Sequence, residues 1–481
     1  MLKAFFKDSS IYTVPLVLTY GINFFLLPLY TRILSPADYG ILDLLKLFEA
    51  LVFLTVAFEV VQGHGRYYMD EKNPANKVSY ASTALIFTIF CFSCFLILSQ
   101  SFAYVTSKIL FGVEGLEDVF RLGSLYISVG GVLLFVNTQF RYELRAKHYA
   151  FVSFATFAST AFFSVFFAYF LEFKLRGMVV ALLIGNASGL LLGFWLLKSS
   201  FRLTFDFRKL KEMLVFSIPL VPAAAAVFVS GYVDRLMINH FFSLQEVGLY
   251  GMGFRIAAIV SLLLVGFSRA LTPLIITHYR EKETPKSIET IFRFFVLFGL
   301  FFFVGLTSFS KEILWLLTTP SYYDASKIVI YLVPAILFSQ MYMFAPGTGI
   351  AKKTIYLMWI TFAISIINPI FNWFLIPHFG IKGAAMATLF AHILGFITHV
   401  VVSQRYYRIP YNWISLITAM SLAVPLAVIG QSLRLGEVDH LIFKFILLGL
   451  LAVICYWTKL ISKQEILFGL EQVKFLFRKK S

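Results

Sequence analysis

The hydrophobic positions of this chain gather in long apolar runs, and the polar positions fall in short segments between them. A helix needs roughly 20 mostly apolar residues to cross about 30 Å of hydrocarbon, and about fourteen runs meet that requirement. The pattern therefore predicts an all-α integral membrane protein. The predicted spans are 10–31, 41–62, 79–100, 120–140, 150–171, 177–197, 213–233, 249–273, 291–309, 328–346, 354–376, 382–402, 413–431 and 441–460.

The composition agrees with that prediction. Of the residues, 59% are hydrophobic and 14% are charged, whereas soluble domains are roughly half apolar and about a quarter charged. The net charge of +16 would suit a nucleic-acid partner. Most Lys and Arg residues, however, lie in the short loops where membrane topology places them, so we expect no nucleic-acid partner.

The basic residues also orient the chain. Loops that follow even-numbered spans carry roughly three times as many Lys and Arg residues as the other loops, and such an excess marks the cytoplasmic side. Lys198 and Arg202 lie in one of these basic loops, and Arg280 and Lys282 lie in another. We therefore expect both chain termini in the cytoplasm.

The chain contains an internal repeat. Residues 35–42 (SPADYGIL) align with residues 243–250 (SLQEVGLY) at an offset of 208, and residues 172–177 align with residues 378–383 at an offset of 206. Similar offsets predict two halves of six spans each. An even number of spans makes both halves enter the membrane from the same side, as in transporters built from parallel repeats. The predicted parts are 1–200 and 201–405 for the two bundles, and 406–481 for two extra spans and a basic tail.

Two cations fall inside predicted spans, where charges are costly and usually face a cavity or a partner. Lys46 lies in the second span, and Arg255 lies in the eighth, its counterpart in the repeat. We expect them to face each other across the axis and to bind an anionic group such as a phosphate or diphosphate.

Further basic residues extend this positive path. Arg269 shares the helix of Arg255, and Ala258, Leu262 and Gly266 lie on a stripe between them that can line a water-filled cavity or let helices pack closely. Arg269 is a candidate for the path, although snorkelling to the interface is the better account of it. Snorkelling is the expected behaviour of Arg293 and Lys444, which lie near span ends. The residues expected at the two mouths of the path are Arg32, Arg66, Arg141 and Arg145.

Three acidic residues are candidates for coupling transport to an ion gradient. Glu49 shares a helix face with Lys46, Glu59 lies nearer the cytoplasmic end, and Asp43 lies just before Lys46. The coupling ion is left open between H+ and Na+. We expect no other cofactor, no metal site and no catalytic residue, because the sequence contains no nucleophile–base pair and no metal-ligand constellation.

Two segments resemble the signatures of a known family. Residues 27–44 (LPLYTRILSPADYGILDL) resemble the first-to-second-span signature of bacterial polysaccharide exporters. Residues 372–388 (NWFLIPHFGIKGAAMAT) resemble their eleventh-to-twelfth-span signature. From end to end the chain is similar to the Wzx-type O-antigen flippases of the multidrug/oligosaccharidyl-lipid/polysaccharide (MOP) exporter superfamily.

This resemblance implies a V-shaped, MATE-like pair of six-helix bundles in the bacterial inner membrane. It also implies a flippase that moves an undecaprenyl-diphosphate-linked oligosaccharide, such as an O-antigen unit of lipopolysaccharide, from the cytoplasmic to the periplasmic leaflet by alternating access. The expected partners are membrane lipid, this lipid-linked glycan, and polysaccharide polymerase and chain-length proteins. A polar cargo requires such a route because it cannot cross hydrocarbon unaided.

Other functions stay open on the same evidence. An ion-coupled small-molecule or drug exporter, or a lipid II flippase, would use the same MOP scaffold. A membrane enzyme such as a sugar polymerase is disfavoured, because it would need a sizeable outward loop that bears catalytic residues. The longest predicted outward loop, 101–119, carries one lysine, Lys108.

Overall fold

The computed structural model describes residues 27–261, 264, 267, 268, 271, 275, 277–433 and 438–461. Across these ranges the regular secondary structure consists of helices only. Ten helices within them are long and apolar enough to cross a membrane, or eleven if one bent pair counts as a single span. The all-α membrane fold is confirmed, whereas the count of fourteen spans stays a prediction.

Ten predicted spans, the third to sixth and the ninth to fourteenth, each correspond to one of these helices. The seventh, 213–233, corresponds to the bent pair, in which Phe207–Ala226 and Gly231–Phe241 meet at 51°. The first span, 10–31, lies mostly outside the described residues, and the eighth, 249–273, lies partly outside them.

The second predicted span, 41–62, is broken in the structure. Helix α2 (Pro36–Thr55) and helix α3 (Val60–Asp70) are separated by Phe58 and Glu59, whose φ angles of 50° and 53° are left-handed. A left-handed backbone is unfavourable for residues with a Cβ, and it ends a right-handed helix.

Contacts with helix α9 (Phe207–Ser217) stabilise this break. The Ser217 hydroxyl donates a 2.7 Å hydrogen bond to the carbonyl of Phe58. Gly63 lets α3 approach α9 closely, since a Cβ there would lie 2.4 Å from the carbonyl oxygen of Met213. The prediction of one continuous span was wrong because the break depends on partners far away in the sequence.

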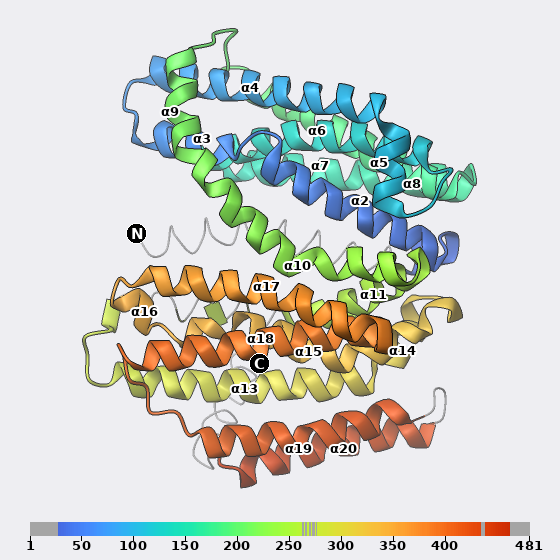
Figure 1. Cartoon of the computed structure of the whole chain (residues 1–481), viewed down its shortest axis with the longest axis vertical. Helices are drawn as coiled ribbons and strands as arrows, with labels where there is room; N and C mark the ends of the chain where they lie inside the picture. The colour runs from blue at the N-terminus through green and yellow to red at the C-terminus, as the bar shows by residue number, and fades with distance from the viewer. Residues whose placement is uncertain are drawn as a thin grey trace, which may run out of the picture. The chain divides into compact units, whose positions relative to one another are not determined.

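The chain forms two compact units, Met1–Gly248 and Leu249–Ser481. In the first unit α6 packs against α4 and α8, α7 packs against α8, α9 packs against α3, and α10 packs against α2 (Figure 1). The division predicted at 200/201 and 405/406 stays a prediction. The other elements of this unit are α4 (Pro74–Ser101), α5 (Ala103–Phe111), α6 (Glu117–Tyr142), α7 (Ala146–Ser164), the π-helical η1 (Val165–Phe170), α8 (Lys174–Leu196), the 3-10 turn η2 (Ile218–Leu220) and α10 (Val221–Phe241).

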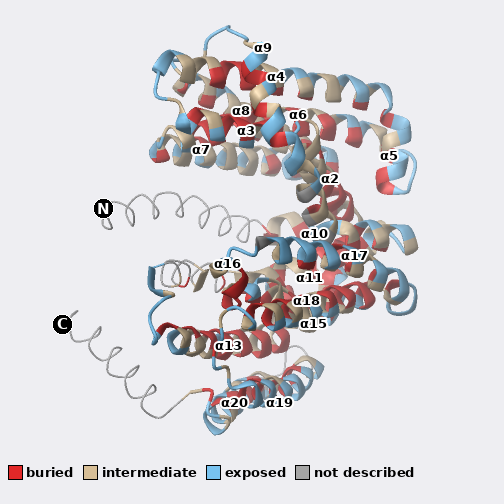
Figure 2. Ribbon diagram, turned by 60° about the vertical axis from the view of Figure 1, so that its left-hand side comes forward, coloured by how far each residue is buried: buried red, intermediate tan, exposed pale blue. Residues whose placement is uncertain are grey.

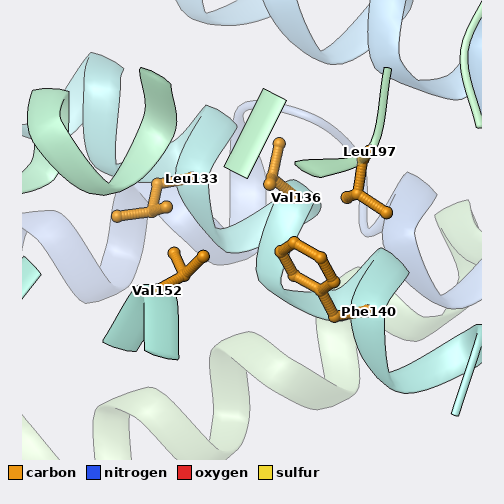
Figure 3. Close-up of a cluster of buried hydrophobic side chains, with 5 residues drawn as sticks. All are labelled: Leu133, Val136, Phe140, Val152 and Leu197. Atoms are coloured by element: carbon orange, nitrogen blue, oxygen red, sulfur yellow. The ribbon is translucent and has the colours of Figure 1, made fainter. Parts of the chain in front are cut away.

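A buried apolar cluster joins α6, α7 and the end of α8. Figure 3 shows Leu133, Val136 and Phe140 of α6 beside Val152 of α7 and Leu197, which follows α8. Each of these side chains is at most 4% exposed. Away from this cluster α7 is mostly unburied (Figure 2), as expected for a helix that contacts lipid.

In the second unit α17 pairs with α18, α15 packs against α18, and α13 packs against both α15 and α19 (Figure 1). Helix α11 (Leu244–Ala257) enters this unit from the first one. The other elements are η3 (Ala258–Val260), α13 (Thr284–Ser308), α14 (Ser310–Leu317), η4 (Pro320–Ala325), α15 (Ser326–Gln340), η5 (Met341–Phe344), α16 (Gly347–Ile350), α17 (Thr354–Phe379), α18 (Ile381–Gln404), α19 (Trp413–Ser432) and α20 (Val438–Trp457).

The two copies of the first repeat motif have the same local structure. Ser35 caps α2 by accepting a hydrogen bond from the backbone of Asp38 at 3.2 Å. Ser243, 208 residues later, accepts one from the backbone of Glu246 at 3.3 Å, at the start of α11. The same serine in the same role at both positions supports the repeat.

The glycines of this motif make a reciprocal contact. A Cβ on Gly40 would lie 1.9 Å from the carbonyl oxygen of Leu244, and a Cβ on Gly248 would lie 1.8 Å from that of Pro36. Positions 36 and 40 are the repeat equivalents of positions 244 and 248, so each copy packs against the other in the same way. Both glycines are therefore needed for close helix approach, which any side chain would prevent.

Polar contacts hold the last described helix, α20, in place within the second unit. Lys444 of α20, which is fully buried, forms a 2.6 Å ion pair with Glu312 of α14. Arg293 pairs with Glu289 at 3.0 Å and donates to the carbonyl of Leu460 at 3.2 Å. The expectation that Lys444 snorkels was wrong, because a carboxylate from a helix 132 residues earlier reaches it.

Breaking the buried ion pair is expected to destabilise the protein strongly. Lys444→Met leaves Glu312 unpaired and should lower the free energy of unfolding by about 3–5 kcal/mol, whereas adding Glu312→Leu should restore most of it. Thermal unfolding of the purified protein in detergent measures both changes. Lys327→Met, which removes an exposed pair with Asp324, is the matched control and should cost less than about 1 kcal/mol. Equal losses in the two single variants would contradict the assignment.

Adding one methyl group at the reciprocal contact should also destabilise the fold. Gly40→Ala is expected to cost about 1–3 kcal/mol, because the new Cβ overlaps a backbone carbonyl that cannot move aside. The same change in Gly305→Ala, where no atom lies within 4 Å of the new Cβ, should be neutral or stabilising. The midpoints of thermal unfolding compare the two, and a loss in Gly305→Ala alone would refute the packing argument.

Candidate functional site

Helix α2 carries a polar face within the first unit. Lys46 is exposed, and Glu49, one turn later, is partly buried. The Tyr126 hydroxyl of α6 donates a 2.6 Å hydrogen bond to Glu49 Oε2. Asn186 Nδ2 of α8 donates to the carbonyl of Tyr126 at 3.4 Å. Three helices thus contribute to one polar cluster, Glu49–Tyr126–Asn186.

Gly130 makes room for this cluster. A Cβ at this position would lie 2.7 Å from Asn186 Nδ2 and 3.6 Å from Glu49 Oε1. Glu49 was predicted from the sequence, whereas Tyr126, Asn186 and Gly130 were not. The sequence did contain an indication of these residues, because polar and small residues within several spans are typical of helix contacts in membranes.

The other acidic candidates lie on the same helix or at its end. Asp43 is buried, with 8% of its surface exposed, and it lies one turn before Lys46. Glu59 lies in the break between α2 and α3 and is partly buried. All three candidates for ion coupling therefore belong to α2 or to the break that follows it.

The basic residues expected at the mouths have different surroundings. Arg32 is exposed. Arg66 forms an exposed ion pair with Asp70 at 3.1 Å on α3. Arg141 donates to the hydroxyl of Thr138 at 2.8 Å, one turn earlier on α6. The guanidinium of Arg66 is therefore partly neutralised, whereas the hydroxyl beside Arg141 leaves its charge in place.

Arg145 belongs to a chain of hydrogen bonds at the end of α6. His64 Nε2 lies 2.7 Å from Gln139 Oε1, the Gln139 amide donates to Glu143 at 2.8 Å, and Glu143 pairs with Arg145 at 3.3 Å. Arg145 also donates to the carbonyl of Leu196 at 3.0 Å. Because an amide oxygen only accepts, His64 carries its proton on Nε2. Arg145 is thus held in place by groups of α6 and α8.

Helix α10 carries a buried charged pair just beyond the end of the seventh predicted span (213–233), and this pair was not predicted from the sequence. Asp234 and Arg235 of α10 are 5% and 7% exposed, and the Arg235 guanidinium lies 3.2 Å from the Asp234 carboxylate. Two adjacent charges directly after an apolar run were visible in the sequence, and charges at membrane depth are usually paired.

In the second unit Arg255 lies on α11 and is partly buried. Directly after Ala257 the helix tightens into the 3-10 turn η3. Arg269 and two residues of the predicted stripe, Leu262 and Gly266, lie outside the described residues. Lys46 belongs to the first unit and Arg255 to the second, so their expected approach across the axis stays a prediction.

The second unit contains a cavity of about 490 Å³, and Phe254, the residue before Arg255 in the chain, lies in its lining. The described lining residues come from α11, from η3 and the positions 261, 264 and 268 after it, and from α15. Ala258, a residue of the predicted small-residue stripe, lies in the lining. The lining residues are Phe254, Ala258, Ser261, Leu264, Ser268, Ile336, Ser339 and Gln340.

Helices α17 and α18 share a buried polar cluster. Asn372 Nδ2 donates to Asn368 Oδ1 at 3.0 Å, and Asn368 Nδ2 lies 3.4 Å from the Thr388 hydroxyl. Asn372 Oδ1 is buried and has no hydrogen-bond partner among the described residues. Oxygen atoms of this kind bind hard cations. Within the same ranges no group of three His, Cys, Asp or Glu side chains could hold a metal ion.

The sequence is similar to one described family and to several known proteins. The family model described as "Polysaccharide biosynthesis protein" matches residues 29–274, which is more than half of the chain, and the model "MatE" matches residues 219–374. The Haemophilus influenzae "Lsg locus putative protein 1" is 27% identical over 288 residues, which cover 58% of this chain and 67% of that protein. A second H. influenzae protein, an "Uncharacterized membrane protein", is 26% identical over 278 residues, covering 56% of this chain and 64% of that protein.

Solved structures share the fold. "Lipid II flippase MurJ, inward closed conformation" matches with a TM-score of 0.71 at 16% identity, over 92% of this chain and 97% of that chain. An inward-facing "multidrug resistance MATE family transporter of the MOP superfamily" matches with a TM-score of 0.63 at 14% identity, over 83% and 97% of the two chains. At such identities the likeness shows the fold alone, and that fold is the one of MOP superfamily transporters.

Removing the hydroxyl of Tyr126 should test the polar cluster. Tyr126→Phe keeps the ring but leaves the Glu49 carboxylate without its donor, so the free energy of unfolding should fall by about 1.5–3 kcal/mol. Tyr104→Phe is the matched control, because its hydroxyl bonds only to the exposed Glu114. Thermal unfolding of both variants in detergent measures the difference, and equal stability would show that the Tyr126–Glu49 bond contributes nothing.

Proposed function

Since the chain belongs to the polysaccharide biosynthesis protein family, we propose that it is a flippase for lipid-linked oligosaccharide. The cargo is an undecaprenyl-diphosphate-linked repeat unit of O-antigen or a similar surface polysaccharide. The protein moves it from the cytoplasmic to the periplasmic leaflet of the bacterial inner membrane by alternating access, with both chain termini in the cytoplasm.

The family match is the observation that carries this proposal, because it joins polysaccharide biosynthesis to a chain with ten described helices that are long and apolar enough to cross a membrane. The MOP transporter fold supports a transport role over a synthetic one. The similarity to a protein of the Lsg locus is consistent with the proposed flippase function. A sugar-diphosphate headgroup is polar, so a protein route through hydrocarbon is what polysaccharide export requires.

The proposed roles of the charged residues follow from their chemistry. Lys46 and Arg255 hold the diphosphate, since Arg offers paired hydrogen bonds and Lys offers a point charge. Arg32, Arg66, Arg141, Arg145 and Arg269 extend the positive path for an anionic cargo. Glu49, Glu59 and Asp43 are the candidates for coupling to H+ or Na+. Polymerase and chain-length proteins are the expected partners after transport.

Neutralising the two central cations should abolish most transport. In a strain that lacks this protein, lipid-linked repeat units should accumulate on the cytoplasmic side, and the wild-type chain should restore surface polysaccharide. Lys46→Ala and Arg255→Ala should each lower the export rate by about ten- to a hundredfold, because each removes a charged hydrogen bond to the diphosphate.

Arg176→Ala is the control for this experiment, because Arg176 is exposed and pairs with Asp118 at 3.1 Å. Expression levels are compared for every variant. Normal surface polysaccharide in the deletion strain would contradict the flippase proposal. Normal export by both cation variants would contradict the assigned residues but not the function.

A second candidate is an ion-coupled exporter of small molecules or drugs, which the match of residues 219–374 to the MatE model favours. Binding to the purified protein separates the two: a flippase should bind lipid-linked oligosaccharide, whereas a drug exporter should bind organic cations. Including lipid II as a third ligand also tests the lipid II flippase alternative.

A further inference from the structure

The loop between α8 and α9, residues 197–206, presents large apolar side chains on its outer surface. The backbone N–H of Thr204 donates to the carbonyl of Arg202 at 2.8 Å, so Leu203 lies at the tip of a tight turn and is 100% exposed. Phe205 is half exposed, and Phe207, the first residue of α9, is 72% exposed. Apolar side chains gathered on a surface in this way mark contact with a membrane or with another molecule.

Contacts with the rest of the first unit hold the α8–α9 loop in this position. The backbone N–H of Arg202 donates to the Ser82 hydroxyl of α4 at 2.8 Å, and that of Asp206 donates to the Thr83 hydroxyl at 3.1 Å. Phe201 packs against the buried cluster of α6, α7 and the end of α8. The exposed apolar side chains are therefore displayed by a loop whose backbone is fixed.

The loop lies at the level where its neighbours enter the membrane. Ser82 is eight residues from the start of α4, or about 12 Å along the helix, and the predicted span begins at residue 79. Trp195, in the last turn of α8, is exposed, and tryptophan is enriched at membrane–water interfaces. Figures 1 and 2 show the loop projecting beside α4. Irregular backbone does not face lipid within the hydrocarbon, so this loop belongs at the interface.

Exposed basic side chains flank the apolar ones on both sides. Asp206 and Glu212 are the two carboxylates among them. Asp206 caps α9 by accepting hydrogen bonds from its backbone. Glu212 accepts from the Tyr80 hydroxyl at 2.7 Å and lies 4.0 Å from Arg208, and an exposed ion pair of that length is weak. A positive surplus therefore remains. The exposed basic residues are Lys198, Arg202, Arg208 and Lys211.

This combination of groups matches one occupant, the headgroup region of an anionic membrane. Segments that lie in the interface bury apolar side chains at the boundary of the acyl chains and place Lys and Arg beside the phosphates. Anionic lipids of the cytoplasmic leaflet attract basic segments that adjoin spans. The loop adjoins α8 before it and the seventh predicted span after it, so lipid is within its reach.

We propose that the α8–α9 loop binds anionic phospholipid of the cytoplasmic leaflet. Leu203, Phe205 and Phe207 insert below the phosphates, and Arg202 and Arg208, which flank them, bind the phosphate oxygens. This inference goes beyond the proposed transport function, because it concerns the lipid that surrounds the protein and holds for any cargo.

The test uses the full chain in nanodiscs of phosphatidylcholine with a fluorescent label on the loop. Thr204→Cys carries the label in a chain whose own cysteines, Cys91, Cys94 and Cys455, are changed to alanine. Lipid with brominated acyl chains quenches the label on contact. Brominated phosphatidylglycerol and brominated phosphatidylcholine are compared by the mole fraction that gives half-maximal quenching, which measures the preference for an anionic headgroup at the loop.

Phosphatidylglycerol should reach half-maximal quenching at a mole fraction at least about fivefold lower than phosphatidylcholine, since one basic side chain beside an anionic leaflet contributes about that factor. The double variant Arg202→Gln/Arg208→Gln should abolish the difference. Arg176→Gln, which removes an exposed arginine of a predicted outward loop, is the matched control and should preserve it. Thermal unfolding confirms that each variant is folded.

Three outcomes would overturn the proposal. Quenching by iodide in the buffer, without quenching by either brominated lipid, would place the loop in water and leave it open to a soluble partner. Equal quenching by the two lipids would show insertion without a site for an anionic headgroup. A preference for phosphatidylglycerol that survives in the double variant would show that Arg202 and Arg208 do not bind the headgroup.

Discussion

The cost of burying a polar group without a partner governs the placement of polar side chains throughout this protein. In a chain that is 59% hydrophobic, most helix surface can contact lipid or another helix with little preference. The buried polar groups remove that freedom, because each of them needs one particular partner. Glu49 requires Tyr126, His64 requires Gln139, and Lys444 requires Glu312. These contacts join different helices, so they define which helices are neighbours and in what register.

Small residues impose the complementary constraint. Gly40 and Gly248 bring two backbones into direct contact, Gly63 does the same against Met213, and Gly130 makes room for the side chain of Asn186. Between apolar helices in a membrane, close packing supplies attraction that the hydrophobic effect does not. The reciprocal contact also agrees with the sequence repeat. Gly40 packs against Leu244, and Gly248, which is 208 residues after Gly40, packs against Pro36, which is 208 residues before Leu244.

The sequence predicted features that depend on local composition and missed those that depend on distant partners. Apolar runs are properties of one segment, so ten helices appear where the runs were identified. The alignment of Ser35 with Ser243 likewise predicted two equivalent helix starts. The break at Phe58 and Glu59 was not predicted, because the contacts that accompany it come from Ser217 and Met213 of another helix. The same applies to Tyr126, whose hydroxyl is informative only once it is known to face Glu49.

The ion pair of the terminal helix has a consequence for how the protein is made. Glu312 is synthesised 132 residues before Lys444, so at about 5–20 residues per second its carboxylate exists for roughly 7–26 seconds before its partner leaves the ribosome. During this interval the carboxylate must stay hydrated, since burial without a counter-charge is unfavourable. The ion pair can therefore form only after α20 has been synthesised, which makes docking of this helix one of the last steps in assembly of the second unit.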